Sequence, residues 1–120
     1  MDELDPQQKP AARFLLSSIE DGGSRGLQIE NAGRQLDLLL VRKGEEVYCY
    51  LNRCPHTGVN LDWVPDQFLD NESTYIQCAT HGALFRIEDG FCVAGPCAGQ
   101  ALSSIQVIND GEYVDILAFT

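Results

Sequence analysis

Both histidines of this 120-residue chain fall within one two-part pattern of metal-binding residues. The first part is Cys54-Pro55-His56, and the second, after 21 intervening residues, is Cys78-Ala79-Thr80-His81. Each part supplies one thiolate and one imidazole and is followed closely by a glycine, and we call them the first ligand arm (54–58) and the second ligand arm (78–82). Two distant Cys-His pairs serve one metal centre only if the fold brings them to the same point. This requirement constrains the fold more than any other feature of the sequence.

Three kinds of site use cysteine and histidine in this way. Tetrahedral zinc takes two of each, but its ligands usually come as Cys-x₂₋₄-Cys and His-x₃₋₅-His pairs, whereas here the pairs are mixed. A cysteine activated by a histidine acts as a nucleophile, yet one such pair leaves the other unexplained. A [2Fe-2S] cluster with two cysteines on one iron and two histidines on the other uses all four residues. The pattern favours this third site, with Cys54, His56, Cys78 and His81 as ligands.

The composition allows one globular domain and restricts its partners. A length of 120 residues is enough for a single buried core. The formal net charge of −10 predicts that neither nucleic acid nor an anionic membrane is a partner. It favours redox protein partners with a basic docking surface.

The N-terminus and the cysteine count predict a cytoplasmic protein. The acidic segment Met1–Pro6 has no basic or apolar region of a secretory signal. The longest apolar run, Leu38–Val41, is far shorter than the ~20 residues of a membrane span. Five cysteines are an odd number for a disulfide framework, so we expect reduced thiols that are available to bind metal.

Short apolar runs between turn residues predict an all-β fold. We expect a flexible acidic leader over residues 1–12 and one domain over 13–120, with the cluster-binding part at about 52–98. The expected strands are Arg13–Leu16, Leu27–Glu30, Gln35–Val41, Val47–Leu51, Tyr75–Gln77, Leu84–Ile87, Phe91–Val93, Ile105–Ile108 and Tyr113–Ala118. The expected turns contain Gly33, Gly44, Gly90 and Gly111, where a positive φ is needed. Both ligand arms are expected at hairpin tips, with 62–73 as a polar surface loop between them.

The chain resembles the Rieske-type ferredoxins, a family of small soluble proteins. The matching residues are Cys54-Pro55-His56-Thr57-Gly58, the run Cys78–Phe85, and Gly95-Pro96, where the family has a proline loop that covers its cluster. The resemblance implies stacked antiparallel sheets with a small cluster-binding subdomain. It also implies one [2Fe-2S] cluster, with Cys54 and Cys78 on the inner iron and His56 and His81 on the outer iron.

The same resemblance implies a one-electron carrier, an electron-transfer component that is not a stand-alone enzyme and has no catalytic residue of its own. Three functions fit such a protein. One is a ferredoxin component that passes electrons from a reductase to a terminal oxygenase, and another is a small subunit resembling that of nitrite reductase. The third is a structural or regulatory subunit in which the metal holds the fold. The sequence leaves all three open.

Some residues depart from the respiratory-complex type of Rieske protein. That type has an extra cysteine in each ligand loop, where this chain has Val59 and Thr80. It also has a serine and a tyrosine whose hydroxyls bond to sulfur, where this chain has Ala83 and Phe85. Because hydrogen bonds to sulfur raise the reduction potential, their loss predicts a carrier toward the bottom of the roughly −150 to +300 mV Rieske range.

The remaining cysteines have other expected roles. Cys49 and Cys92 are expected to be small buried hydrophobes. Cys97 follows Pro96 in the expected cover loop, where it is either a buried thiol or a redox-active one.

The expected surface loop at 62–73 carries one aromatic residue and several acids. Trp63 either docks a partner or packs beneath the loop. Asp66, Asp70 and Glu72 either steer a basic partner or form an ordinary solvated face.

Overall fold

The computed structural model describes residues 10–31, 33–53, 55, 61, 66–70, 72–78 and 82–117. Its elements are β1 Pro10–Leu15, the 3₁₀ helix η1 Leu16–Ser18, β2 Ser24–Asn31, β3 Arg34–Lys43, β4 Glu46–Leu51, β5 Tyr75–Gln77, β6 Leu84–Arg86, β7 Cys92–Ala94, β8 Val107–Asn109 and β9 Tyr113–Leu117. All nine expected strands are present, with ends displaced by three residues or fewer, so the all-β prediction is confirmed. The first strand begins at Pro10, ahead of the expected start of the domain at residue 13. Within the described ranges, no helix has the length and apolar character needed to span a membrane.

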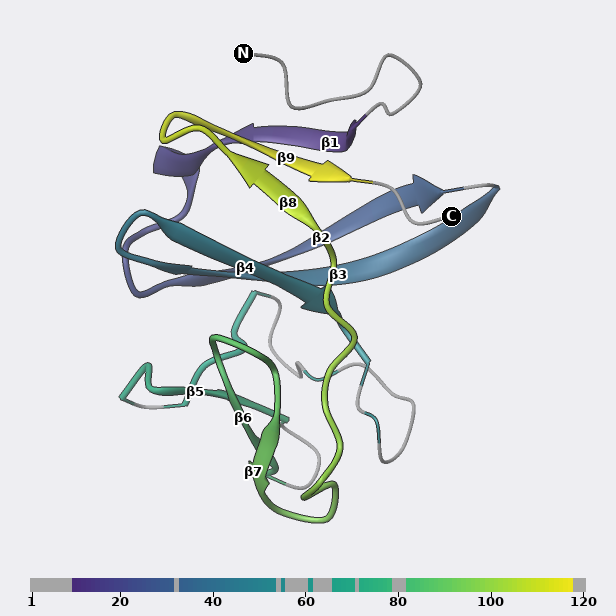
Figure 1. Cartoon of the computed structure of the whole chain (residues 1–120), viewed down its shortest axis with the longest axis vertical. Coiled ribbons are helices and arrows are strands. Elements are labelled where there is room, and N and C mark those ends of the chain that lie inside the picture. The colour runs from purple at the N-terminus through teal and green to yellow at the C-terminus, as the bar shows by residue number, and fades with distance from the viewer. Residues whose placement is uncertain are drawn as a thin grey trace.

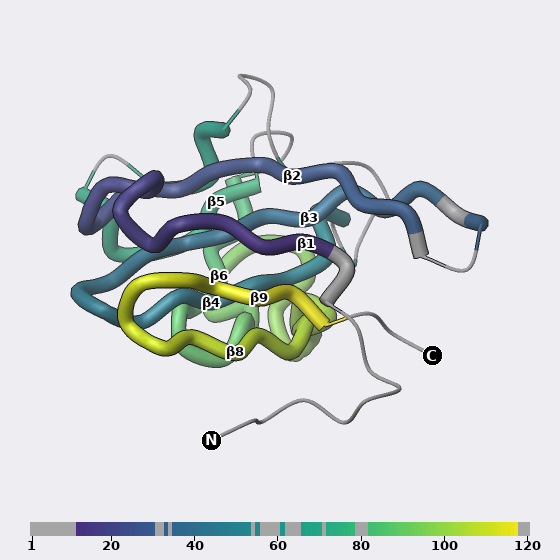
Figure 2. Tube along the Cα trace, turned by 90° about the horizontal axis from the view of Figure 1, so that it is seen from above, coloured from purple at the N-terminus to yellow at the C-terminus, as the bar shows by residue number. Residues whose placement is uncertain are grey.

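The strands form three antiparallel sheets of three strands each. Sheet A has the order β1-β9-β8, sheet B the order β2-β3-β4, and sheet C the order β5-β6-β7. Sheet A lies at the top of Figure 1, sheet B crosses the middle, and sheet C lies below. Seen from above in Figure 2, sheet A lies over sheet B. The predicted stacking of antiparallel sheets is therefore confirmed.

Strand β3 is the centre of the stack because it is buried on both faces. Side chains alternate along a strand, so Leu38 and Leu40 pack toward sheet A while Leu39 and Val41 pack toward sheet C. All four are at most 1% exposed. This double burial explains why the run is continuously apolar instead of alternating. Each of these side chains stabilises the fold by roughly 1.5–3 kcal/mol.

Tyr50 joins sheet C to sheet B. Its hydroxyl donates a hydrogen bond of 2.6 Å to the carbonyl of Ile87, in the turn between β6 and β7. Gly90 in the same turn has φ +74°, and a Cβ there would lie 2.8 Å from the Tyr50 ring. Burial raises the pKa of the Tyr50 hydroxyl, which therefore stays protonated and able to donate. At the surface, an ion pair between Lys43 and Glu88 links the same turn to β3.

The segment between the ligand arms is not wholly a surface loop, so that prediction is wrong in part. Phe68 is fully buried in the core between sheets B and C. Its carbonyl accepts the Gln77 N–H at 2.8 Å, and Leu69 forms an isolated bridge to Ile76. One buried aromatic side chain thus fixes a segment whose neighbours in the sequence are polar.

Candidate metal centre

Cys78 is the one predicted ligand that the structure describes. It follows β5 directly and its side chain is fully buried. The other three predicted ligands, Cys54, His56 and His81, lie outside the described residues. Among the residues that are described, no group of three or more His, Cys, Asp or Glu side chains is placed to hold a metal. The structure therefore describes the bases of the two arms, and the ligand set remains a prediction.

The base of the second ligand arm is a tight turn between β5 and β6. The Cys78 N–H donates to the Ala83 carbonyl at 2.9 Å, and the Gly82 N–H donates to the Cys78 carbonyl at 2.8 Å. Gly82 has φ +70°, a conformation that glycine adopts without strain. The strands continue in register from Gln77 opposite Leu84. This arm is a hairpin tip, as predicted.

The first ligand arm follows β4, and its residues other than Pro55 lie outside the described ones, so its expected place at a hairpin tip stays a prediction. Strand β4 belongs to sheet B and the next strand, β5, belongs to sheet C. The arm therefore lies on a connection between two sheets. The Asn52 side chain closes its base, because the amide oxygen accepts the Leu61 N–H at 2.7 Å. Asn52 is 7% exposed, and its own N–H donates to the Asp37 carbonyl in β3.

The bases of both arms share one apolar core. Leu61, which follows the first arm, belongs to the same buried cluster between sheets B and C as Cys78 of the second arm and Ala83 directly after it. Phe85 in β6 is a further fully buried member. The fold thus brings together two chain segments that are distant in the sequence, as a shared metal centre requires. A buried thiolate in apolar surroundings fits the inner iron of a [2Fe-2S] cluster.

The loop after β7 packs directly on the second arm. Gly95 has φ +100°, and a Cβ at that position would lie 2.8 Å from the Ala83 Cα. Only glycine fits such a close approach at this backbone angle. Gly95 therefore lies against Ala83, directly after the second arm, while the covering of a cluster by the Gly95-Pro96 segment stays a prediction.

Two positions at which the respiratory-complex type has a hydroxyl and this chain has none are buried. Ala83 is 1% exposed and Phe85 is fully buried. Neither side chain can donate a hydrogen bond to sulfur. This chemistry agrees with the predicted loss of two donors near the arm that carries Cys78.

The other cysteines pack as predicted. Cys49 is 3% exposed in the core between sheets A and B, and burial raises the pKa of its thiol to about 12. Cys92 is 1% exposed in the core between sheets B and C, and so is Cys97. Cys97 is thus a buried thiol, although its sulfur contacts that of Cys92, which the sequence pattern did not predict.

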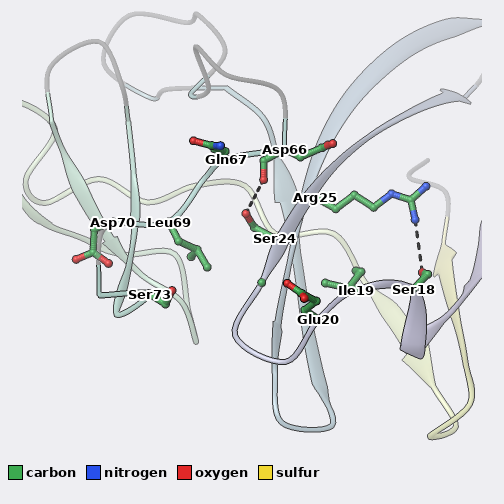
Figure 3. A pocket seen from close by; sticks show the side chains of 11 residues that line it. Ser18, Ile19, Glu20, Ser24, Arg25, Asp66, Gln67, Leu69, Asp70 and Ser73 are labelled. Atoms are coloured by element: carbon green, nitrogen blue, oxygen red, sulfur yellow. Dashed lines mark hydrogen bonds between the residues drawn. The ribbon is translucent and has the colours of Figure 1, made fainter.

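A polar pocket of about 420 Å³ lies between the start of β2 and the segment before β5 (Figure 3). The Ser24 hydroxyl donates to the Asp66 carbonyl at 2.7 Å, and the Gly26 N–H donates to the Asp66 carboxylate at 2.8 Å. The Arg25 guanidinium points away toward Ser18. The hydrogen bonds of Asp66 to Ser24 and Gly26 connect the segment before β5 to β2.

The acids expected to steer a partner also have local roles. The Asp70 carboxylate accepts the N–H groups of Thr74 and Tyr75 at 2.8 and 3.1 Å, and Asp66 binds β2 as above. Glu72 is exposed. Trp63 lies outside the described residues, and its role stays a prediction.

Sequence reasoning missed three contacts that hold the arms. They are the Asn52–Leu61 hydrogen bond, the Tyr50–Ile87 hydrogen bond and the Cys92–Cys97 sulfur contact. Of these residues only Tyr50 and Cys92 lie in strands, and the others lie in the connections that follow β4, β6 and β7. The one signal available was Asn52 itself, a polar residue directly after an apolar strand.

One family is matched over most of the chain. The family described as the Rieske [2Fe-2S] domain matches residues 16–110, a range that includes both ligand arms. No curated protein sequence matches the chain at a significant level.

Several solved structures share the fold. The chain is similar to the ferredoxin of carbazole 1,9a-dioxygenase from Nocardioides aromaticivorans IC177, with a TM-score of 0.70 and 24% identity over 93% of this chain and 98% of that one. It is also similar to the terminal oxygenase of carbazole 1,9a-dioxygenase from Novosphingobium sp. KA1, with a TM-score of 0.70 and 21% identity over 94% of this chain but only 30% of that one. It is similar as well to a chain from a complex of reduced oxygenase and oxidized ferredoxin in carbazole 1,9a-dioxygenase. The TM-score is 0.66, and the identity is 20% over 97% of this chain and 98% of that one. At these identities the likeness establishes the fold.

Proposed function

Because the chain belongs to the Rieske [2Fe-2S] domain family, we propose that it carries single electrons between two protein partners. The family implies one [2Fe-2S] cluster of the Rieske type as the cofactor. In this proposal Cys54 and Cys78 bind the inner iron, and His56 and His81 bind the outer iron. The observation that carries the proposal is the family match over residues 16–110, which spans all four ligands.

The bound cluster supplies a one-electron redox couple. The thiolates of Cys54 and Cys78 offset the positive charge of two ferric ions and two sulfides, so the oxidised centre is near neutral. The neutral imidazoles of His56 and His81 add no negative charge, which places the potential above that of an all-cysteine cluster. The apolar neighbours of Cys78 exclude water from the inner side.

The reduction potential belongs at the low end of the Rieske range. Hydroxyl donors to sulfur stabilise the reduced, more negative centre. Ala83 and Phe85 provide none, and both are buried where solvent cannot replace a missing donor. We therefore place the potential toward the bottom of the roughly −150 to +300 mV interval.

The partners we propose are a reductase that donates the electron and a terminal oxygenase that accepts it. The similar fold over nearly the full length of a carbazole dioxygenase ferredoxin supports this choice. With a net charge of −10, the chain suits partners whose docking surface is basic. We place the protein in the cytoplasm, where thiols such as Cys49 and Cys78 stay reduced.

The proposed domain limits follow the expected ones except at the N-terminus. Because β1 begins at Pro10, we place the start of the Rieske domain at residue 10 instead of 13, with the cluster-binding part at about 52–98 and an acidic leader at 1–9. The family match to residues 16–110 lies inside the domain, and sheet C lies inside the cluster-binding part.

A reductive titration and a stopped-flow measurement of electron transfer together test this function. We expect a reductive titration to deliver one electron per chain. In stopped-flow experiments the reduced protein should then pass this electron to a terminal Rieske oxygenase, at a rate that falls as ionic strength rises because opposite charges are screened. A Cys78→Ser variant serves as the control, since it removes a proposed cluster ligand and should accept no electron.

Two other results would each replace the proposal. A salt-resistant complex with a large sirohaem protein would favour a nitrite reductase subunit. A fully metal-loaded protein that takes up no electron would favour a structural subunit.

A further inference from the structure

Two cysteine sulfurs lie side by side in the core beneath the second ligand arm. The Sγ atoms of Cys92 and Cys97 are 3.3 Å apart, and each residue is 1% exposed. Neither residue is among the predicted cluster ligands. Two thiols at this separation are available for chemistry that one buried thiol cannot perform.

The backbone holds this sulfur contact in place. Cys92 lies in β7, opposite Phe85 of β6. The chain then turns at Gly95 and folds back, so that the Cys92 N–H donates to the Gln100 carbonyl at 2.8 Å and the Gln100 N–H donates to the Cys97 carbonyl at 2.9 Å. The backbones of Cys92 in β7 and of Cys97 in the following loop are therefore both tied to Gln100, which keeps the two residues close together.

The pair differs from the other described cysteines. Cys49 lies in the separate core between sheets A and B, and Cys78 is assigned to the cluster in the function proposed above. Around Cys92 and Cys97, the loop residues 94–96 and 98–100 are exposed. The two thiols therefore lie directly beneath an exposed loop, whereas Cys49 lies in the core between sheets A and B.

We propose that Cys92 and Cys97 form a reversible disulfide, a modification site distinct from the metal centre. A disulfide needs the sulfurs at about 2.05 Å, so they have to approach by little more than 1 Å. The ring then spans residues 92–97 and contains Gly95, which packs on Ala83. The bond therefore fixes the loop that lies against the second ligand arm.

The oxidant we assign is a low-molecular-weight disulfide such as oxidised glutathione. After the loop opens, the thiolate of one cysteine attacks the glutathione disulfide, which forms a mixed disulfide and releases one glutathione thiol. The second cysteine then attacks the protein-bound sulfur and releases the other glutathione. Overall, two protein thiols lose two electrons and two protons, and one glutathione disulfide gains them. Disulfides of this transient kind occur in reducing compartments.

Trypsin separates the relevant cysteines. Cleavage after Lys43, Arg53 and Arg86 gives peptide 44–53 with Cys49, peptide 54–86 with Cys54 and Cys78, and peptide 87–120 with Cys92 and Cys97. The native cluster-loaded protein is incubated with oxidised glutathione and quenched in acid. It is then alkylated with iodoacetamide under denaturing conditions, digested and weighed by mass spectrometry.

We expect peptide 87–120 to lose both alkylation sites and to be lighter than the dithiol form by two hydrogen atoms. Dithiothreitol should restore both sites, while Cys49 in peptide 44–53 remains alkylated throughout. The Cys97→Ser variant should leave Cys92 unable to form the ring, and the Cys49→Ser variant should leave the ring intact.

Three results overturn the disulfide. They are two alkyl groups on peptide 87–120 after oxidation, a stable glutathione adduct on that peptide, and a bond between it and peptide 54–86. The readout does not depend on electron transfer. An EPR spectrum of an untreated portion of the same preparation tests the cluster, so failure of the disulfide and failure of the proposed function are distinguishable.

Discussion

The side-chain oxygen of Asn52 accepts the backbone N–H of Leu61 at 2.7 Å, and both residues are buried. The chain between these two residues carries Cys54 and His56, half of the proposed ligand set. A buried N–H that loses its acceptor costs roughly 1–3 kcal/mol. The hydrogen bond therefore stabilises the base of the first ligand arm.

Replacing Asn52 by leucine should weaken this base. We expect the Asn52→Leu variant to lose about 1–3 kcal/mol of unfolding free energy, because the Leu61 N–H stays buried without this acceptor. The variant should also hold less iron per chain than the unchanged protein. Urea unfolding and iron analysis measure the two effects. The Gln28→Leu variant, which makes the same kind of change at an exposed position of β2, is the control. Equal iron content in the two variants would contradict a role for Asn52 in the arm.

Gly95 and Gly99 offer a matched pair for testing the contact with the second arm. Both have a positive φ, +100° and +92°, so alanine introduces similar backbone strain of roughly 1–3 kcal/mol at each. At Gly95 the added Cβ also meets Ala83 at 2.8 Å, whereas at Gly99 it meets nothing within 4 Å. We expect Gly95→Ala to be the more destabilised variant in urea unfolding, and to be the one with altered cluster absorption. Equal losses of unfolding free energy in the two variants would contradict a close contact between Gly95 and the residues at the second arm.

Adding hydroxyl groups at positions 83 and 85 should raise the reduction potential of the cluster. The Ala83→Ser and Phe85→Tyr variants place donors where the respiratory type has them. A hydrogen bond to a charged group contributes about 1.5–3 kcal/mol, which for one electron corresponds to an increase of roughly 60–130 mV. Protein-film voltammetry measures this shift. Phe68→Tyr, in the same core but packed against Gly26, is the control and should leave the potential nearly unchanged. A potential well above zero in the unchanged protein would contradict the low-potential assignment.

Cys49 should make stability fall at high pH. Burial raises the pKa of its thiol from 9.0 to about 12 in the folded protein, so between these values the unfolded chain loses the proton first. The contribution of the buried Cys49 thiol to the unfolding free energy is therefore fully present below about pH 9 and is lost as the pH rises toward 12. We expect the Cys49→Val variant to show a smaller decrease in unfolding free energy across this interval. Iodoacetamide should also leave Cys49 of the folded protein unmodified at pH 8, and rapid labelling there would contradict its burial.

Local patterns were enough to predict the strands but not the way in which the arms are held. The short apolar runs and the turn glycines are local signals, and they predicted strand β3 and the turns on either side of it, but not the burial of β3 on both faces. Sequence order did not show that β4 and β5, the described strands on either side of the first arm, belong to different sheets.

Side-chain contacts between elements leave even less trace in the sequence. The carbonyl that Tyr50 bonds lies 37 positions away, and the acceptor for Leu61 is nine positions back. Phe68 was hidden in a polar segment because one aromatic residue creates no periodicity. The ligand residues were identifiable from their type and spacing, since metal chemistry restricts both.

The most direct test of a Rieske cluster on Cys54, His56, Cys78 and His81 is an EPR spectrum of the dithionite-reduced protein, with iron and zinc measured on the same sample. We predict two irons per chain and a rhombic spin-½ signal with the low average g-value of mixed cysteine and histidine ligation. The signal should be lost in the Cys78→Ser variant. An EPR-silent protein that contains zinc and no iron after anaerobic preparation would contradict the account.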